Sequence, residues 1–143
     1  MGANSKLTIA IHALVWAALN ERQGSTYSTS EEIANSIKTN PVVVRRMMSD
    51  LTKAGLIESR RGAGWRLNKP ADTMTLWDIN LALGPEETFA LHRHEPSATC
   101  PVARGIRPAL KPTYARVDEA VRQELARTTL ADVFDETLTP TQN

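Results

Sequence analysis

The segment from residue 28 to residue 69 constrains the fold of this chain more than any other, because it combines two helix signals, a break between them and a basic hairpin. Between Lys38 and Lys69 there are eight lysine and arginine residues and only two acidic ones. This stretch therefore carries a charge of +6, and the other 111 residues carry −5 to give the net charge of +1. Positive charge gathered on one unit of a nearly neutral protein predicts a polyanion-binding surface, and duplex DNA is the obvious polyanion.

The first helix signal is the sequence STSE at residues 28–31, which matches a capping box. In this interpretation the Ser28 hydroxyl accepts a backbone N–H, and the Glu31 carboxylate reaches back to the start of the helix. The helix that follows would bury Ile33 and Ile37, which lie four residues apart.

The second helix signal begins at Asn40, a good N-cap, followed by Pro41 at the first helical position, where the missing N–H costs nothing. We expect this helix to run to about Ala54 and to end at Gly55, which tolerates a left-handed backbone. Its expected buried stripe is Val44, Met48 and Leu51. Two short helices joined by a tight turn predict a helix-turn-helix.

A hairpin is expected directly after this unit, with strands over residues 56–59 and 65–67 around a glycine-bearing turn over residues 60–64. A hairpin in this place is a wing, and we expect Trp65 to pack against its base. An ordinary helical pair with a solvated basic face is the alternative interpretation, but the basic wing favours DNA binding. The residues expected to bind DNA are Ser28, Thr39, Asn40, Pro41, Val42, Val43, Arg45, Arg46, Arg60 and Arg61.

The rest of the chain reads as helical, and the predicted fold class is mainly α with a small β-hairpin. We expect a winged helix-turn-helix DNA-binding domain over residues 5–84, an effector or linker loop over 85–105, and a dimerisation helix with a C-terminal cap over 106–138. Pro108 and Pro112 lie in the early turns of that last helix and are expected to kink it or delay its start.

The long C-terminal helix carries an apolar stripe with helical spacing. A small winged domain can cover only part of it, so the stripe favours a homodimer over packing within one chain. The expected dimer interface is Ile106, Leu110, Tyr114, Val117, Val121 and Leu125.

Three stretches carry a family resemblance: NPVVVRRMMSDLTKAGLIESRRG from Asn40, CPVARGI from Cys100, and TLADV from Thr129. With them the chain resembles the Rrf-two (Rrf2) family of bacterial transcription repressors, which includes the iron–sulfur cluster regulator and the nitrite-sensitive repressor. The resemblance implies a winged-helix homodimer whose long helices cross between subunits, and operators of dyad symmetry. Many members bind an iron–sulfur cluster through three clustered cysteines, whereas this chain resembles the cluster-free subgroup with a single Cys-Pro-Val cysteine.

Cys100 is the one cysteine of the chain, so an intrachain disulfide is impossible and a reducing cytoplasm is the expected compartment. No stretch is apolar enough to predict a membrane span. His92 and His94 lie near Cys100, but no fourth ligand is apparent, so we expect no metal and no cofactor. Cys100 is instead a candidate thiol sensor, with a small packing residue as the alternative.

The function predicted from sequence is thus a cytoplasmic, homodimeric, DNA-binding transcriptional regulator, most simply a repressor, and not an enzyme. One alternative is control by a protein partner or a small ligand at the 85–105 loop. A thiol-reactive enzyme with Cys100 as nucleophile is a weaker alternative, because it would leave the basic hairpin unexplained. The operator, the regulated genes and the effector are not specified by the sequence.

Overall fold

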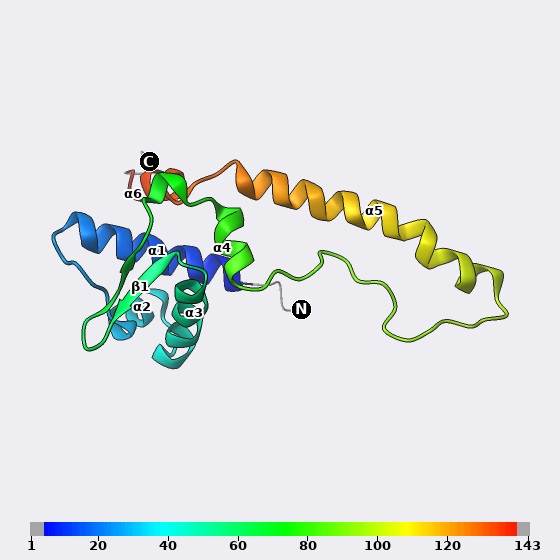
Figure 1. The fold of residues 1–143 in the computed structure, drawn as a ribbon, viewed down its shortest axis with the longest axis horizontal. Helices are drawn as coiled ribbons and strands as arrows, with labels where there is room; N and C mark the ends of the chain where they lie inside the picture. Colours follow the sequence, from blue (N-terminus) through cyan, green and yellow to red (C-terminus); the bar gives the residue numbers. More distant parts are fainter. Residues whose placement is uncertain (1–4, 140–143) are drawn as a thin grey trace. The chain divides into compact units, whose positions relative to one another are not determined.

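The computed structural model describes residues 5–139 (Figure 1). Its elements in chain order are α1 (Lys6–Arg22), α2 (Ser30–Ile37), α3 (Pro41–Lys53), β1 (Ile57–Arg60), β2 (Gly64–Leu67), the 3-10 helix η1 (Ala71–Thr73), α4 (Leu76–Ala82), α5 (Pro101–Ala126) and α6 (Leu130–Leu138). The described residues form two compact units. The first contains residues up to 85 together with those from 126 onward, and the second contains residues 86–125.

The start of α2 differs by one residue from the capping box expected at Ser28 and Glu31. Thr29 is the N-cap: its hydroxyl accepts the Glu32 N–H at 3.2 Å, and the Glu32 carboxylate accepts the Thr29 N–H at 2.8 Å. Ser28 cannot act as the cap, because its hydroxyl is buried and accepts a hydrogen bond from Asn20 Nδ2 at 2.9 Å. Its backbone is also engaged, since it pairs with strand β2.

The turn and helix α3 follow the prediction closely. Asn40 Oδ1 accepts the Val42 N–H at 2.8 Å, and Pro41 is the first helical residue. Gly55, just beyond the end of α3, has a φ of 77°, as a C-terminal left-handed residue requires. Lys38 also has a positive φ, 63°, so the tight turn between α2 and α3 uses a lysine where glycine is the less strained choice.

The wing is an antiparallel pair of β1 and β2, in which Glu58 lies opposite Arg66 and Arg60 opposite Gly64. A third piece of extended chain joins it, because Ser28 forms an antiparallel bridge with Trp65. The two backbone hydrogen bonds of this bridge measure 2.8 and 2.9 Å. The wing is therefore fastened to the segment that leads into α2.

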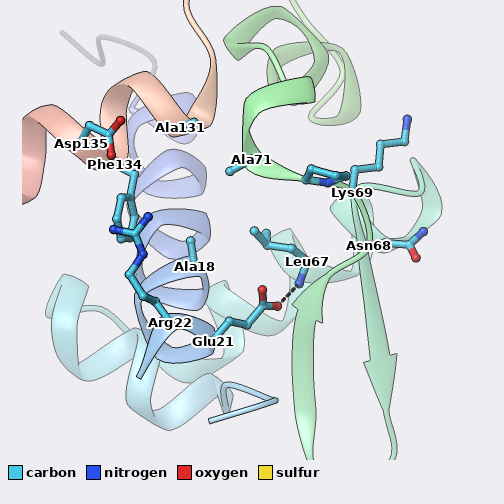
Figure 2. Close-up of a pocket in the computed structure, with 11 residues that line it drawn as sticks. Ala18, Glu21, Arg22, Leu67, Asn68, Lys69, Ala71, Ala131, Phe134 and Asp135 are labelled. Atoms are coloured by element: carbon cyan, nitrogen blue, oxygen red, sulfur yellow. Dashed lines mark hydrogen bonds between the residues drawn. The ribbon is translucent and has the colours of Figure 1, made fainter. Parts of the chain in front are cut away.

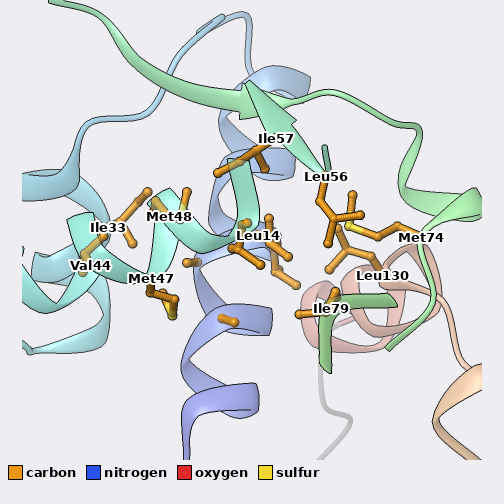
Figure 3. Close-up of a cluster of buried hydrophobic side chains, with 14 of the residues drawn as sticks. Leu14, Ile33, Val44, Met47, Met48, Leu56, Ile57, Met74, Ile79 and Leu130 are labelled. Atoms are coloured by element: carbon orange, nitrogen blue, oxygen red, sulfur yellow. The ribbon is translucent and has the colours of Figure 1, made fainter. Parts of the chain in front are cut away.

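The hydrophobic core of the first unit draws on α1, α2, α3, β1, α4 and α6 (Figure 3). Leu14 of α1 and Met48 of α3 are fully buried in it, and Trp65 packs against it as expected for the base of the wing. Its buried apolar side chains include Ala10, Ala13, Leu14, Val15, Ile33, Ala34, Val44, Met47, Met48, Leu51, Leu56, Ile57, Met74, Ile79, Leu130 and Phe134.

Helix α6 belongs to this first unit. The sequence instead predicts it as a C-terminal cap, in one region with the long helix over residues 106–138. Leu130 and Phe134 are buried in the core. The Leu130 N–H donates to Met74 O at 2.7 Å, and Thr129 forms a bridge with Thr75. The capping sequence from Thr129 to Asp132 predicts a terminal turn of helix but not the surface on which it packs.

In the second unit, α5 begins at Pro101, five residues before the predicted start at Ile106. Proline is well tolerated at a first helical position, and the Cys100 carbonyl accepts the Arg104 N–H at 3.1 Å. The helix therefore contains Pro108 and Pro112 within its length instead of starting after them. Each of the two lacks the N–H that would bond to the preceding turn.

Within residues 5–139, no helix combines the length and apolar character that crossing a bilayer requires.

Candidate nucleic-acid interface

The outer face of α3 presents both apolar and basic side chains to solvent. Val42 is 53% exposed and Val43 is 47% exposed, and Arg45 and Arg46 are also exposed. Val44 lies between them in sequence but points into the core with no exposure. The helical spacing therefore separates the buried stripe from a face that can enter a groove of DNA.

The turn before α3 contributes less than the sequence suggested. Thr39 and Pro41 are half-buried. Asn40 is exposed, but its Oδ1 caps the helix, which leaves its amide N–H groups to reach outward. Ser28 is 1% exposed and its hydroxyl is bonded to Asn20, so its side chain has no route to a duplex.

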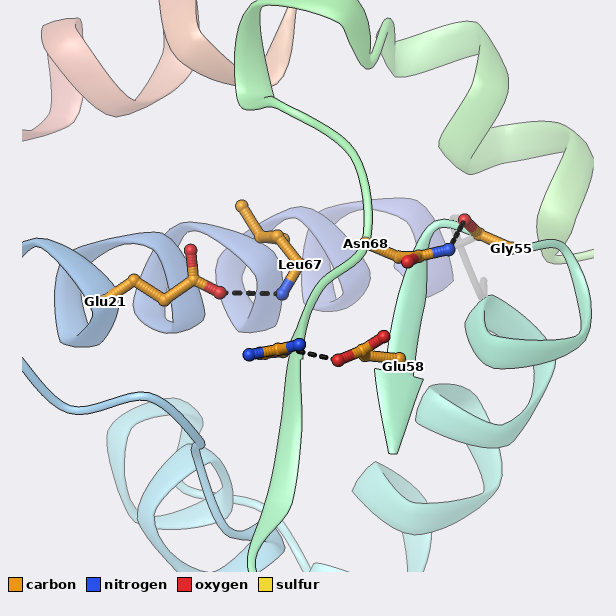
Figure 4. Close-up of polar contacts among 6 residues, drawn as sticks. Glu21, Gly55, Glu58, Leu67 and Asn68 are labelled. Atoms are coloured by element: carbon orange, nitrogen blue, oxygen red, sulfur yellow. Dashed lines mark hydrogen bonds and ion pairs between the residues drawn. The ribbon is translucent and has the colours of Figure 1, made fainter. Parts of the chain in front are cut away.

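The wing carries its uncompensated positive charge near its tip. Arg60 and Arg61 are exposed, and Gly62 turns the chain with a φ of 79°. Arg66 differs from these two arginines, because its Nε pairs with the Glu58 carboxylate across the hairpin (Figure 4). That hydrogen bond raises the pKa of Arg66 above its ordinary value. The wing thus has a neutralised base and a cationic tip.

Two further contacts fix the base of the wing (Figure 4). The Glu21 carboxylate of α1 accepts the Leu67 N–H at 2.8 Å, and Asn68 Nδ2 donates to Gly55 O at 3.1 Å. The hairpin is thereby tied to α1 and to the end of α3. A rigid wing loses little freedom when it binds, which favours affinity.

The wing approaches the segment that leads into α2 closely at Gly64. This residue has a φ of 118°, and a Cβ added there would lie 2.1 Å from the Ser28 carbonyl oxygen. Only glycine permits the bridge between Ser28 and Trp65. The sequence indicated Gly64 only as part of a turn, and the partner that demands a glycine is 36 positions away.

Tyr27 is a residue that sequence reasoning missed. It is half-buried, and its ring centroid lies 5.9 Å from the Arg60 guanidinium carbon and 5.2 Å from that of Arg66. Both distances fit cation–π contacts. No local sequence pattern marks Tyr27, because the arginines that it contacts follow the helix-turn-helix, more than 30 residues later in the chain.

A cavity of about 660 Å³ lies behind the wing, between the end of α1, the chain after β2 and α6 (Figure 2). Arg22 stacks over the Phe134 ring at 4.4 Å on one wall, and Glu21 occupies another. The lining carries charges of both signs and contains none of the predicted DNA-binding residues. It does not define a ligand class.

In the second unit, Arg107 of α5 holds the preceding loop. Its guanidinium donates to the carbonyl oxygens of His92 at 2.6 Å and His94 at 3.0 Å, and to the Glu95 carboxylate at 2.9 Å. The side chain of Cys100 is exposed in the single chain. Within the described part of the chain, no three His, Cys, Asp or Glu residues are grouped to hold a metal ion.

The family model of Rrf2, described as iron-dependent transcriptional regulators, matches residues 3–136. The chain belongs to the Rrf2 family. Membership confirms the predicted family and the winged-helix fold, and it makes the protein a DNA-binding transcriptional regulator and not an enzyme. The donor set of this chain does not fit the iron of the family description. One cysteine and no grouped ligands among residues 5–139 cannot supply a cluster or iron site within one subunit.

Similar proteins cover most of the chain. YwnA of Bacillus subtilis (strain 168), provisionally named an HTH-type transcriptional regulator, is 42% identical over 92% of this chain and 96% of its own. A crystal structure of a protein provisionally described as DNA-binding has a TM-score of 0.73 and 38% identity, over 90% of this chain and 98% of that one. Staphylococcus aureus CymR, also solved in an oxidized form, has a TM-score of 0.69 and 25% identity, over 92% and 97%.

The first prediction concerns the close approach at Gly64. Gly64→Ala should lower the free energy of unfolding by more than about 2 kcal/mol, because the added Cβ meets the Ser28 carbonyl as well as imposing a strained backbone. Gly62→Ala is the matched control: it has open space, so only the left-handed backbone should cost about 1–2 kcal/mol. Urea unfolding followed by circular dichroism measures both. Equal losses in the two variants would contradict the bridge.

Proposed function

We propose that this Rrf2 regulator is a cytoplasmic homodimeric repressor that binds an operator of dyad symmetry through α3 and the tip of the wing. The exposed cationic face of the first unit carries the proposal. Within residues 5–139 no carboxylate pairs with Arg46, Arg60 or Arg61, so their charges are available to a polyanion. A regulator that acts on chromosomal operators would act in the cytoplasm.

The two parts of this face suit different roles. Arg45 and Arg46 stand on the exposed side of a helix that can enter the major groove, where arginine reads guanine through two hydrogen bonds. Val42 and Val43 offer apolar contacts for thymine methyl groups. Arg60 and Arg61, at the tip of the wing, suit phosphates or a narrow minor groove.

The second prediction separates these roles. Arg46→Ala should weaken operator binding by about 1–3 kcal/mol and relax the sequence preference at one position, as loss of a base contact does. Arg60→Ala should weaken binding to all sequences alike and lower the salt-dependence slope by about 1. The operator is first isolated by genomic selection with wild-type protein, and affinities are then measured by fluorescence anisotropy across a salt series.

Arg93→Ala is the matched control for this experiment, because Arg93 is an exposed arginine in the loop of the second unit. It should bind DNA as the wild type does. If a protein lacking Arg45, Arg46, Arg60 and Arg61 keeps its circular dichroism spectrum and its operator affinity, the proposed DNA surface is wrong.

Dimerisation is proposed because α5 is left largely uncovered in a single chain. This helix has 26 residues, and none of them is buried. Its apolar stripe is at best half-covered, and Val121 remains 37% exposed. The Phe89 ring lies 5.5 Å from the Tyr114 ring and covers only one position. A long amphipathic helix needs a partner surface, and a second copy of α5 supplies a matching one.

The third prediction tests the dimer. Val117→Asp would place an unpaired charge in the proposed interface, so the variant should be monomeric or unfolded and should lose tight operator binding. Ala115→Asp, on the opposite and exposed side of α5, is the control and should remain dimeric. Light scattering reports the mass of each protein. A wild type that is a stable monomer at micromolar concentration would contradict the proposal, which requires the two α3 helices, as the recognition helices, to lie about 34 Å apart.

We propose that the protein senses its signal through the thiol of Cys100. This residue is exposed and directly precedes α5, the helix of the proposed dimer interface. The alternative is a small ligand or a protein partner at the 85–105 loop. A cavity of about 360 Å³ lies there, bounded by residues 95–98 and by Arg104 and Arg107.

The fourth prediction distinguishes these signals. Peroxide or an electrophile should change operator affinity of the wild type by about tenfold, a coupling typical of regulatory switches. Cys100→Ser should bind the operator before treatment and should not respond afterwards. Mass spectrometry of the treated protein confirms modification of the cysteine. If oxidised wild type binds as the reduced protein does, the loop cavity becomes the place to seek the effector.

A further inference from the structure

We propose that Tyr27 positions Arg60 for a DNA phosphate, so that a residue outside both the recognition helix and the wing sets the strength of the wing contact. This inference rests on the proposed DNA-binding surface and adds a residue to it. It starts from the arrangement of three extended segments: residues around Ser28, strand β2 and strand β1.

The register of these segments brings three side chains into one row. Ser28 pairs with Trp65, so by antiparallel geometry Tyr27 lies across from Arg66. Arg66 in turn lies opposite Glu58 and pairs with it. The row therefore places a ring, a cation and a carboxylate side by side, and the cation is held from both sides.

Arg60 reaches the same ring from a diagonal position. It is two residues beyond Glu58 in β1 and so lies on the same face of the wing. The residue opposite Arg60 is Gly64, which has no side chain to block the path towards Tyr27. The Arg60 guanidinium carbon lies 5.9 Å from the ring centroid.

The two arginines that contact this ring differ in whether their charge is already compensated. Arg66 is already compensated by Glu58. Arg60 is exposed, and within residues 5–139 its side chain has no hydrogen bond or ion pair and stacks on the ring of Tyr27. A guanidinium on an aromatic ring keeps its N–H donors available to other groups. Tyr27 can thus restrict Arg60 while leaving those donors to a phosphate, which lowers the entropy lost on binding.

The experiment compares Tyr27→Leu with Tyr27→Phe on the selected operator and on an unrelated duplex of the same length. Tyr27→Leu should weaken binding to both by about threefold to tenfold, because a phosphate contact is independent of sequence. It should also lower the salt slope. Tyr27→Phe keeps the ring and should bind as the wild type does. In an Arg60→Ala background, Tyr27→Leu should have no further effect.

Three results would overturn the proposal: wild-type affinity in Tyr27→Leu, a failure of phenylalanine to restore binding, or equal losses with and without Arg60. Arg46→Ala is measured in the same series. It should lower the ratio of operator affinity to unrelated-duplex affinity, whereas Tyr27→Leu should leave that ratio unchanged. A normal ratio in Arg46→Ala would count against the proposed base readout, independently of Tyr27.

A second measurement covers the case in which Tyr27→Leu does not fold. In the free wild-type protein, the ring current of Tyr27 should shift the Arg60 δ-methylene protons upfield in a proton–carbon NMR spectrum. Tyr27→Phe should preserve that shift. An Arg60 side chain with random-coil shifts in the wild type would show that the ring does not hold it, and would overturn the proposal.

Discussion

The bridge between Ser28 and Trp65 is the interaction on which the proposed DNA-binding surface depends. It consists of two backbone hydrogen bonds, and it is possible because Gly64 has no side chain. A two-stranded hairpin alone is only marginally stable in water. Joining it to the segment before α2 gives it a third strand and fixes its direction relative to α3. The tip arginines and the recognition helix can then contact one duplex together.

The same bridge explains why the polar residues at the start of α2 divide their roles. Ser28 is buried and its backbone pairs with Trp65, so it does not cap α2. Thr29 and Glu32 form the capping box instead. The side chain that precedes the bridge, Tyr27, is left on the wing face beside Arg66. The backbone bridge that fixes the wing therefore also places the Tyr27 ring next to Arg60 and Arg66.

Features encoded by near neighbours could be predicted from sequence, and features that join distant segments could not. Asn40 and Gly55 define the ends of α3 through hydrogen bonds and backbone angles within a few residues. These local interactions do not depend on the rest of the fold, so the sequence predicts them. The docking of Leu130 beside Met74 joins positions 56 residues apart, and no periodicity encodes it. The start of α5 differs from the predicted one because Pro108 and Pro112 argue against a helix through these positions, whereas Pro101 is favourable at a first helical position.

The charges on the surface also show this difference between local sequence and long-range contacts. A count of charges along the sequence identifies the basic segment, but it treats every arginine as equivalent. The structure shows that Arg66 is paired with Glu58 and that Arg107 is paired with Glu95, so neither adds an uncompensated charge. In the proposed interface, uncompensated charges such as those of Arg46 and Arg60 are the ones expected to release counterions from DNA. Pairing across strands and turns, not composition alone, decides which cations of this regulator are available for that role.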